Sequence, residues 1–537
     1  MFTKIADKPK CESVTAAQSG KSSLSLEYTI KPSDKFLHVF ELSNTFSTNT
    51  STLRDKEIKT IVTKMDKLYN EVTKSKNATL NDIITLAYSY QNLCHGYIKS
   101  NQKEGLRIGK TYILRCLNLV KGKELDPKSI LIALKGHFQL GYIYFTQKKS
   151  EKALQTCNKA IELYLTYTDD KEKYGNPINF ENIITKLSVD GYYLINGIYR
   201  EILKLILESY LNIDDHYFIV YSHLLLAVDL NTLQETGKHH MWIQSAMKIC
   251  VYLVKHDRFV EARNHIITAV YVKNIFLHEM PCNMKEQAIF SKKLNWNKLD
   301  LKLKILLIIP PIRYEIKVLR RSVERLLRLE KGEEFEIDNL NSGHPTKLEG
   351  DISQRLLLFN DIDIEIAFTH INPSLPVKYI SHYNDAYKIF TNILWNVSIA
   401  RIFFYTCRNV REYGKLILDT YEAYKYMAFY VKDVTNRSLL QNMMVNLLSD
   451  GVENKDILKH EPVLYSNIKL HLAISYSYLI DVQLENLDAI HPLYMPQRHN
   501  AIELEIECLV KDAMKSLEMK IAMSKDDYTH MMSQIDY

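Results

Sequence analysis

The stretch "HFQLGYIYFTQKKSEKALQTCNKAIELY", residues 137–164, decides the fold class. It contains Leu140-Gly141, followed at fixed offsets by Tyr144 and Ala153. This order matches the tetratricopeptide pattern, in which two antiparallel helices share one apolar seam. Gly141 and Ala153 are small enough for the helices to approach closely, and Gly141 is expected to face Ala153 at the crossing. Because one pair cannot bury its apolar faces alone, we expect further pairs on both sides.

The composition of the whole chain agrees with a helical array. The sequence has 537 residues, 46% of them hydrophobic, with only 16 Gly and 13 Pro, which favours long helices over strands and turns. A net charge of +6 does not by itself indicate a nucleic-acid partner. The N-terminus lacks a signal-peptide core, no apolar run is long enough to span a bilayer, and the eight cysteines form no C-x-x-C. We therefore expect a soluble, cytoplasmic protein without membrane insertion.

The spacing of apolar residues organises the chain. We predict an all-α, tetratricopeptide-like helical-repeat solenoid in two halves joined by a long central helix. The helical pairs expected in the first half span residues 80–120, 129–168, 182–228 and 241–272. The predicted domains are a disordered N-terminal tail at 1–33, N-terminal repeats at 34–309, a central helix and linker at 310–350, C-terminal repeats at 351–523 and a C-terminal tail at 524–537.

The central helix carries a basic stripe. The segment "PIRYEIKVLRRSVERLLRLEKGEEFE" is expected to begin at Pro310-Pro311, because proline suits a first helical turn. The stripe, opposite an apolar face, consists of Arg313, Lys317, Arg320, Arg321, Arg325 and Arg328. It is either a solvated outer face or a surface for an acidic partner.

No motif for catalysis or metal binding is convincing. "TAAQSGKS" ends like a phosphate loop, but Thr15 stands where the first glycine is required. His239-His240 and His278-Glu279 lack the i, i+4 spacing that places two ligands on one helical face. No side chain lies in a recognisable nucleophile setting. We expect no enzyme, no cofactor and no metal.

First-helix positions of the pair at 129–168 are candidates for partner contact. Lys135, Phe138, Tyr142 and Phe145 fall where a repeat array lines its concave groove. They serve there either as packing residues or as contacts for a partner.

Several segments resemble the KIF-binding protein (kinesin-binding protein) family. They are the pair at 129–168, "HHMWIQSAMKICVYLVKHDRFVEARNHIITAVYV", "IARIFF" and "YGKLILDTYEAYKYMAFYVKD", and the resemblance extends in the same order from about residue 80 to 484. The positions that carry it are Trp242, Phe259, Glu261, Ala262, Arg263, Lys425, Ala428 and Phe429. The chain is expected to stop earlier than the family, which continues through further C-terminal pairs.

The resemblance implies a non-enzymatic, cytoplasmic and cytoskeleton-associated solenoid that clasps kinesin motor domains and keeps their microtubule-binding face off the track. It also implies a role in axonal microtubule organisation, neurogenesis and differentiation, and leaves association with microtubule or tubulin complexes open. Since the motor surface that meets microtubules is basic, acidic loops are further candidate contacts: Asp169, Asp170, Asp214 and Asp215. Their other interpretation is as ordinary polar turns and helix caps.

Two other functions remain as alternatives. A co-chaperone adaptor that binds the C-terminal carboxylate of a client peptide needs Lys, Asn and Arg at the groove positions. Phe138 and Tyr142 occupy those positions, which argues against this function. A scaffold for vesicle or tubulin complexes is the third possibility.

Overall fold

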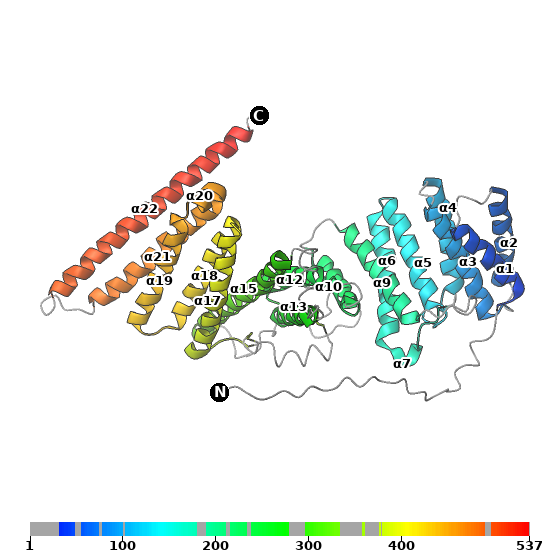
Figure 1. Cartoon of the computed structure of the whole chain (residues 1–537), viewed down its shortest axis with the longest axis horizontal. Coiled ribbons are helices and arrows are strands. Elements are labelled where there is room, and N and C mark those ends of the chain that lie inside the picture. Colours follow the sequence, from blue (N-terminus) through cyan, green and yellow to red (C-terminus); the bar gives the residue numbers. More distant parts are fainter. Residues whose placement is uncertain are drawn as a thin grey trace, which may run out of the picture. The chain divides into compact units, whose positions relative to one another are not determined.

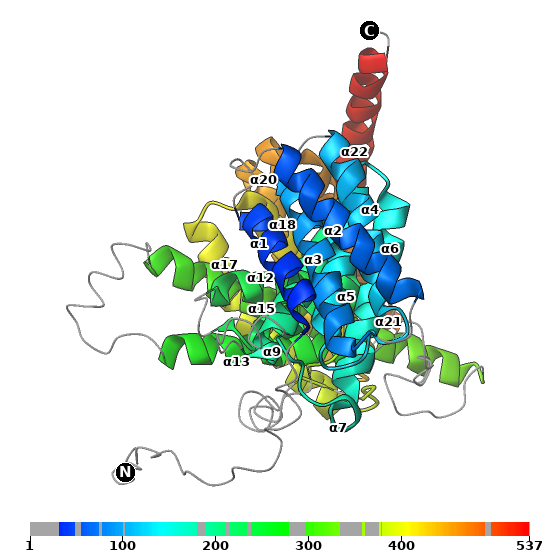
Figure 2. The same cartoon turned by 90° about the vertical axis from the view of Figure 1, so that its right-hand side faces the viewer.

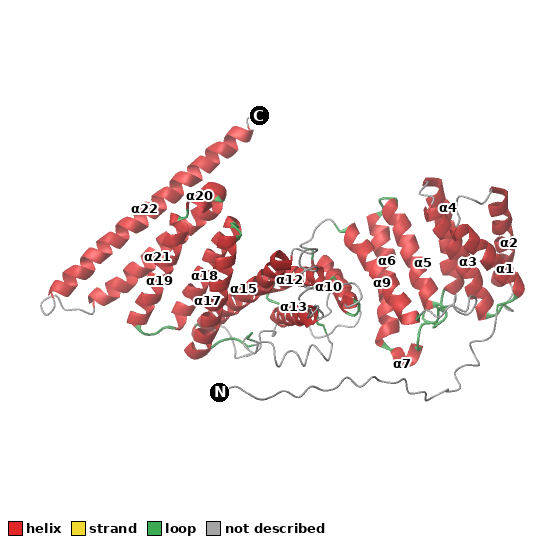
Figure 3. Ribbon diagram, in the orientation of Figure 1, coloured by secondary structure: helices red, strands yellow, loops and turns green. Residues whose placement is uncertain are grey.

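The computed structural model is helical throughout its described part. The described residues are 32–48, 55–74, 78–99, 103–179, 190–210, 215–233, 238–278, 296–332, 357–359, 375–376, 378–488 and 496–535. Within these ranges the chain forms eighteen helices and no β-strand (Figure 3). The prediction of an all-α repeat fold is therefore confirmed.

The chain divides into two compact units, Met1–Leu211 and Asn212–Tyr537, which are described separately. In the first unit α3 packs on α4, α5 on α6, and α9 on both α5 and α6. The helices of this unit are α1 (Asp34–Thr48), α2 (Asp55–Lys74), α3 (Leu80–Lys99), α4 (Lys103–Val120), α5 (Ile130–Thr146), α6 (Ser150–Asp169), α7 (Lys171–Tyr174) and α9 (Gly191–Ser209), as labelled in Figure 1.

The second unit contains two apolar core clusters, one of buried residues between Ile219 and Val431 and one of buried residues between Ile417 and Leu509. Its helices are α10 (His216–Leu230), α12 (His239–Lys255), α13 (Phe259–His278), α15 (Trp296–Glu330), α17 (Tyr383–Thr406), α18 (Val410–Tyr430), α19 (Val434–Glu453), α20 (Lys455–His460), α21 (Pro462–Asp488) and α22 (Pro496–Ile535). The last helix packs along α21 and extends beyond it (Figures 1 and 2).

Three helical pairs share one turn, which sets the repeat register. The turns between α5 and α6, α12 and α13, and α17 and α18 each place a residue other than glycine at positive φ: Lys148 at 58°, Asp257 at 59° and Arg408 at 51°. In each turn the next residue donates its N–H to a carbonyl five residues earlier, as Lys149 does to Tyr144 at 2.9 Å. This left-handed helix end satisfies carbonyls that the helix leaves open. The three pairs therefore share the same turn between their two helices.

The predicted crossing at Gly141 is close but involves other neighbours. A Cβ added to Gly141 would lie 2.6 Å from Cys157 Sγ and 3.5 Å from Leu205 Cδ2, whereas the nearest atom of Ala153 is its carbonyl oxygen at 3.8 Å. Gly141 therefore faces Cys157 and not Ala153. Leu205 of α9 also contacts Gly141, so α5, α6 and α9 meet at this glycine.

The central helix begins earlier than predicted. α15 starts at Trp296, so Pro310 and Pro311 lie inside it. A proline inside a helix costs roughly 3 kcal/mol, because its ring clashes with the preceding turn and its nitrogen donates no hydrogen bond. Leu303 and Leu307 are buried in the core just before the prolines, and this burial offsets the cost. α15 packs against α12 and α13 before it and against α17 and α18 after it, so it is a core element of the second unit.

Other boundaries also differ from those predicted. The two helices expected to pair at 182–228, α9 and α10, are assigned to different compact units. The division after Leu211 differs from the predicted boundary at residue 309, and the predicted boundary at 350 lies outside the described residues, as does most of the predicted tail at 1–33. Residues 524–535, predicted as a tail, continue α22.

Candidate docking site in the second unit

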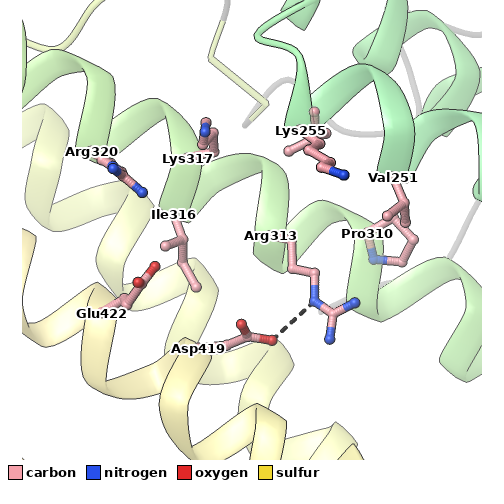
Figure 4. Close-up of a pocket in the computed structure, with 10 residues that line it drawn as sticks. Val251, Lys255, Pro310, Arg313, Ile316, Lys317, Arg320, Asp419 and Glu422 are labelled. Carbon is pink, nitrogen blue, oxygen red and sulfur yellow. Dashed lines mark hydrogen bonds and ion pairs between the residues drawn. The ribbon is translucent and has the colours of Figure 1, made fainter. Parts of the chain in front are cut away.

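A pocket of about 290 Å³ opens between α12, α15 and α18 (Figure 4). Its apolar part is formed by Val251, Val254, Pro310 and Ile316. Its charged part consists of Lys255 from α12, of Arg313, Lys317 and Arg320 from α15, and of Asp419 and Glu422 from α18. Its volume is at the lower edge of the range for small-molecule sites, about 300 to 1,000 Å³.

An ion-pair cluster around Arg313 lines the pocket. Arg313 Nε donates to Asp419 Oδ2 at 3.0 Å, and an Arg313 Nη lies 3.8 Å from Glu412. Burial raises the pKa of Asp419 although the charge of Arg313 lowers it. Arg313 is thus held in place by two carboxylates of α18, and Figure 4 shows it pointing at Asp419.

The other cations of the stripe are also paired within the molecule. Lys317 Nζ lies 3.6 Å from Asp257, which also binds Arg321. Arg320 and Arg321 both donate to Glu324, at 2.8 and 2.6 Å. Although burial opposes it, the hydrogen bond from Arg321 and the charge of Lys317 lower the pKa of Asp257.

The end of the stripe is partly buried. Arg325 is buried, with its guanidinium 4.9 Å from the centre of the Tyr379 ring, whereas Arg328 is exposed. The main part of the basic stripe is therefore not a free surface for an acidic partner, because its partly exposed cations are already paired within the molecule. It connects α15 to α18 and to the turn after α12, whose acidic residues are distant in sequence.

Glu422 provides the pocket with a carboxylate that is not in an ion pair among the described residues. It lines the pocket from α18, and within the described residues no cation is paired with its carboxylate within 4.0 Å. Burial, and then the charge of Asp419, raise its pKa. With an apolar wall and this carboxylate, the pocket can accept one long side chain with an apolar stem and a hydrogen-bond donor at its tip.

The first-unit candidates lie on two helices. Tyr142 on α5 is 37% exposed, whereas Phe145 is half-buried. Asp169 and Asp170 are exposed at the end of α6, and Asp170 accepts a hydrogen bond from the Lys173 N–H at 3.1 Å. Asp170 thus caps α7, but its exposure leaves it accessible.

The remaining acidic candidates belong to the loop before α10. Asp215 is the N-cap of α10 and accepts a hydrogen bond from the Tyr217 N–H at 2.8 Å. Asp214 lies outside the described residues. Asp215 belongs to the second unit, whereas the candidates on α5 and at the end of α6 belong to the first.

One buried polar cluster was not predicted from the sequence. His223 Nδ1 and His265 Nε2 are 3.1 Å apart and both rings contact Phe359. Burial lowers the pKa of both, to about 4 for His265, so both rings are neutral at pH 7. The described residues contain no group of three or more His, Cys, Asp or Glu side chains that could hold a metal ion. In the same residues no helix combines the length and apolarity needed to cross a membrane.

The fold and the pocket define the class of protein: an all-α helical-repeat protein with an internally paired, partly apolar docking pocket. The family model for the C-terminal part of the KIF-1 binding protein matches residues 240–536. This is more than half of the chain, and the chain therefore belongs to the KIF-1 binding protein family.

Other comparisons add little. None of the curated proteins matches the chain. Among solved structures, a circular tandem repeat protein with novel repeat topology and enhanced subunit contact surfaces aligns over 92% of this chain and 98% of its own, with 10% identity and a TM-score of 0.23. A TM-score this low supports no argument about shape or function.

Proposed function

We propose that this protein binds the motor domain of one or more kinesins and modulates their attachment to microtubules. The observation that carries the proposal is the family match over residues 240–536, which includes α12, α15 and α18 and thus the whole docking pocket. A role in binding also agrees with a pocket that combines an apolar wall with the carboxylate of Glu422, while Arg313, Lys317 and Arg320 are held in ion pairs within the molecule.

The proposed action is competitive. A motor bound along the repeat helices and inter-repeat loops is kept off the microtubule, which regulates transport in the cytoplasm, including axonal transport. Exposed Asp169 and Asp170 provide negative charge for a basic motor surface, and such pairing steers association. Because exposed charges are screened beyond about 10 Å at 0.1 M ionic strength, this contribution weakens as salt is added.

Microtubule co-sedimentation tests the proposal directly. A panel of purified kinesin motor domains is mixed with microtubules and increasing amounts of this protein. We expect at least one motor to move from the pellet to the supernatant in a complex with the protein. If no motor is displaced and none co-purifies, kinesin binding is refuted and a general repeat scaffold replaces it.

The acidic loops are tested with asparagine substitutions. Asp169, Asp170, Asp214 and Asp215 are replaced together, because asparagine removes the charge yet still accepts the capping hydrogen bonds seen at Asp170 and Asp215. We expect weaker motor binding at low salt, little change at high salt and an unchanged unfolding midpoint. An equal loss at both salt concentrations would exclude electrostatic steering by these loops.

A further inference from the structure

Residues 357–359, with the sequence Leu-Leu-Phe, belong to no helix and yet are packed into the second unit. Leu357 is 1% and Phe359 4% exposed, and both are part of the apolar cluster between Ile219 and Val431. The residues of α10, α12 and α13 that contact this segment precede it in the sequence by 95 positions or more. The segment is therefore held as a bound peptide would be, by contacts that are distant along the chain.

The helix α13 binds the main chain of this segment. Asn264 Oδ1 accepts from the Phe359 N–H at 2.9 Å, and Asn264 Nδ2 donates to the Phe359 carbonyl at 3.2 Å. Glu261 Oε1, three positions earlier on α13, accepts from the Leu357 N–H at 2.9 Å. Alternate residues of an extended chain face the same side, and helix positions three apart share one face, so the two spacings match. α13 thus supplies hydrogen bonds that a neighbouring strand would otherwise make.

The carboxylate that binds Leu357 is fixed by a buried cation. Arg258 Nε donates to Glu261 Oε2 at 2.8 Å, and an Arg258 Nη donates to Glu261 Oε1. Both side chains are buried. Because a buried carboxylate is costly without a counter-charge, Arg258 allows Glu261 to accept the hydrogen bond from Leu357 inside the core.

Three aromatic rings surround the Phe359 side chain. Its ring centre lies 4.7 Å from that of His223 on α10, 5.3 Å from that of Trp242 on α12 and 4.9 Å from that of His265 on α13. Tilted and edge contacts at these distances favour an aromatic side chain over an aliphatic one. We call the following residues the Phe359 site: His223, Trp242, Glu261, Asn264 and His265.

The rings of the Phe359 site are oriented by hydrogen bonds that do not involve the segment. Trp242 Nε1 donates to the Leu226 carbonyl at 2.8 Å. His265 Nδ1 lies 2.8 Å from the Glu261 carbonyl, which can only accept, so Nδ1 carries the proton. His265 Nε2 then accepts from His223 Nδ1 at 3.1 Å. A site whose side chains are held in place without the ligand loses little conformational freedom when it binds one.

These contacts define the kind of peptide that the site selects. Main-chain hydrogen bonds of this type form with any extended peptide, whereas burial of alternate side chains sets the sequence. The buried positions are Leu357 and Phe359, while Leu358 between them is only half-buried. The site therefore selects an aliphatic residue, any residue and then an aromatic residue.

We propose that the Phe359 site binds an extended Leu-x-Phe segment of a partner polypeptide, and that residues 357–359 are a built-in ligand which the partner segment replaces. None of the contacts depends on which chain supplies the segment. The inference is independent of kinesin binding. A ligand tethered within the same chain has an effective concentration of about millimolar, so a free peptide with the same contacts should bind wild type only weakly.

The test measures binding of a free peptide to the full chain. The probe is a fluorescent peptide with the sequence of residues 353–361, SQRLLLFND, followed by fluorescence polarisation. Leu357→Ser with Phe359→Ser removes the built-in ligand and leaves the Phe359 site unchanged. Because the tethered competitor is lost, we expect this double variant to bind the peptide at least tenfold more tightly than wild type.

Two controls assign the binding to the Phe359 site. A peptide with serine at the positions of Leu357 and Phe359 should bind neither protein. Adding Asn264→Ala to the double variant removes both hydrogen bonds to the main chain of Phe359. We expect this to weaken binding of the SQRLLLFND peptide by about tenfold or more. An unchanged affinity would show that the peptide binds elsewhere and would overturn the proposal.

A second variant covers the case in which the double variant does not fold. Phe359→Leu keeps a large apolar side chain in the core but loses the contacts between aromatic rings. It weakens only the built-in ligand, so the peptide should bind this variant about threefold more tightly than wild type or better. Circular dichroism reports folding. If the folded variants bind the peptide no more tightly than wild type does, residues 357–359 are a permanent part of the core and the proposal is overturned.

Light scattering after size-exclusion chromatography distinguishes a partner from a second copy of this chain. A wild-type monomer agrees with a segment supplied by the same chain. A wild-type dimer that dissociates when the peptide is added would show that a second copy supplies the segment, which would overturn a partner of different sequence. Because these assays contain no motor domain, a failure of kinesin binding would leave their outcome unchanged.

Discussion

Replacing Gly141 with alanine tests the helix crossing at the centre of the first unit. The new Cβ would lie 2.6 Å from Cys157 Sγ, and Cys157 is only 1% exposed, so its sulfur has little space to move. Overpacking of this kind costs roughly 1 to 3 kcal/mol. Alanine is favoured over glycine inside a helix by about 1 kcal/mol, which offsets part of the cost. We expect a net loss of about 1 kcal/mol.

Two further substitutions at the crossing isolate the clash. Gly141→Leu should cost more, about 3 kcal/mol, because its longer side chain also meets Leu205 Cδ2, which lies 3.5 Å from the added Cβ. Combining Gly141→Ala with Cys157→Ala removes the sulfur, so the glycine substitution should become neutral or stabilising. The double-mutant cycle should give a coupling of about 1 to 2 kcal/mol.

Gly197 provides the matched control for the same chemical change. It lies inside α9, and a Cβ added there meets nothing within 4 Å. Gly197→Ala should therefore stabilise the protein by about 0.5 to 1 kcal/mol. The assay is urea unfolding followed by circular dichroism. If Gly141→Ala and Gly197→Ala stabilise the protein equally, the close crossing of α5, α6 and α9 at Gly141 is refuted.

Three other predictions concern stability. Lys148 has a φ of 58°, so Lys148→Gly should raise the free energy of unfolding by about 0.5 to 1 kcal/mol, and Lys148→Ala should not. Burial raises the pKa of Glu315 from 4.5 to about 8. The folded protein therefore keeps a proton that the unfolded chain has lost between these pH values, and stability falls as pH rises across this window. Glu315→Gln, which can still bind Asn392, should remove this loss. In thermal unfolding between pH 5 and 8, the stability of the variant relative to wild type should therefore rise by up to about 1.4 kcal/mol per pH unit. A stability difference that stays constant with pH would refute the raised pKa of Glu315. Arg258→Ala leaves the buried Glu261 without the guanidinium that donates to it at 2.8 Å. It should cost about 3 to 5 kcal/mol in urea unfolding, and a loss below 1 kcal/mol would contradict the role of this pair.

Local sequence patterns predicted most helices because helical spacing and polar turns depend on residues that are close together in the sequence. Helical spacing and polar turns placed α3, α4, α5, α6, α12 and α13 close to their observed bounds. They failed at Pro310, which was expected to begin a helix because proline suits a first helical turn. The helix begins earlier, since the burial of Leu303 and Leu307 offsets the cost of proline inside it. The positive φ shared by Lys148, Asp257 and Arg408 could not be predicted, since none of these residues is the glycine that usually marks such a turn.

The candidate surfaces were predicted less completely. The groove positions on α5 followed from the repeat pattern, but only the structure shows that Tyr142 is exposed and Phe145 half-buried. Nothing in the sequence distinguishes the exposed Trp395 and Ile402 from the buried Ile393 and Val397, because both stripes of the helix are apolar. Periodicity identifies apolar faces but does not tell which of them a neighbouring helix covers.

The sequence by itself determined the helical class, the pairing of α5 with α6 and the resemblance to a family that the comparison then confirmed. These depend on residues within a few turns of one another, or on the order of segments along the chain. Only the tertiary structure decided the role of the basic stripe, since Arg313 meets Asp419 across 106 positions and Arg321 meets Asp257 across 64. It also decided that Trp395 and Ile402 of α17 stay exposed. Long-range packing brings distant charges together and covers one apolar stripe while leaving another free, and no local pattern encodes that choice.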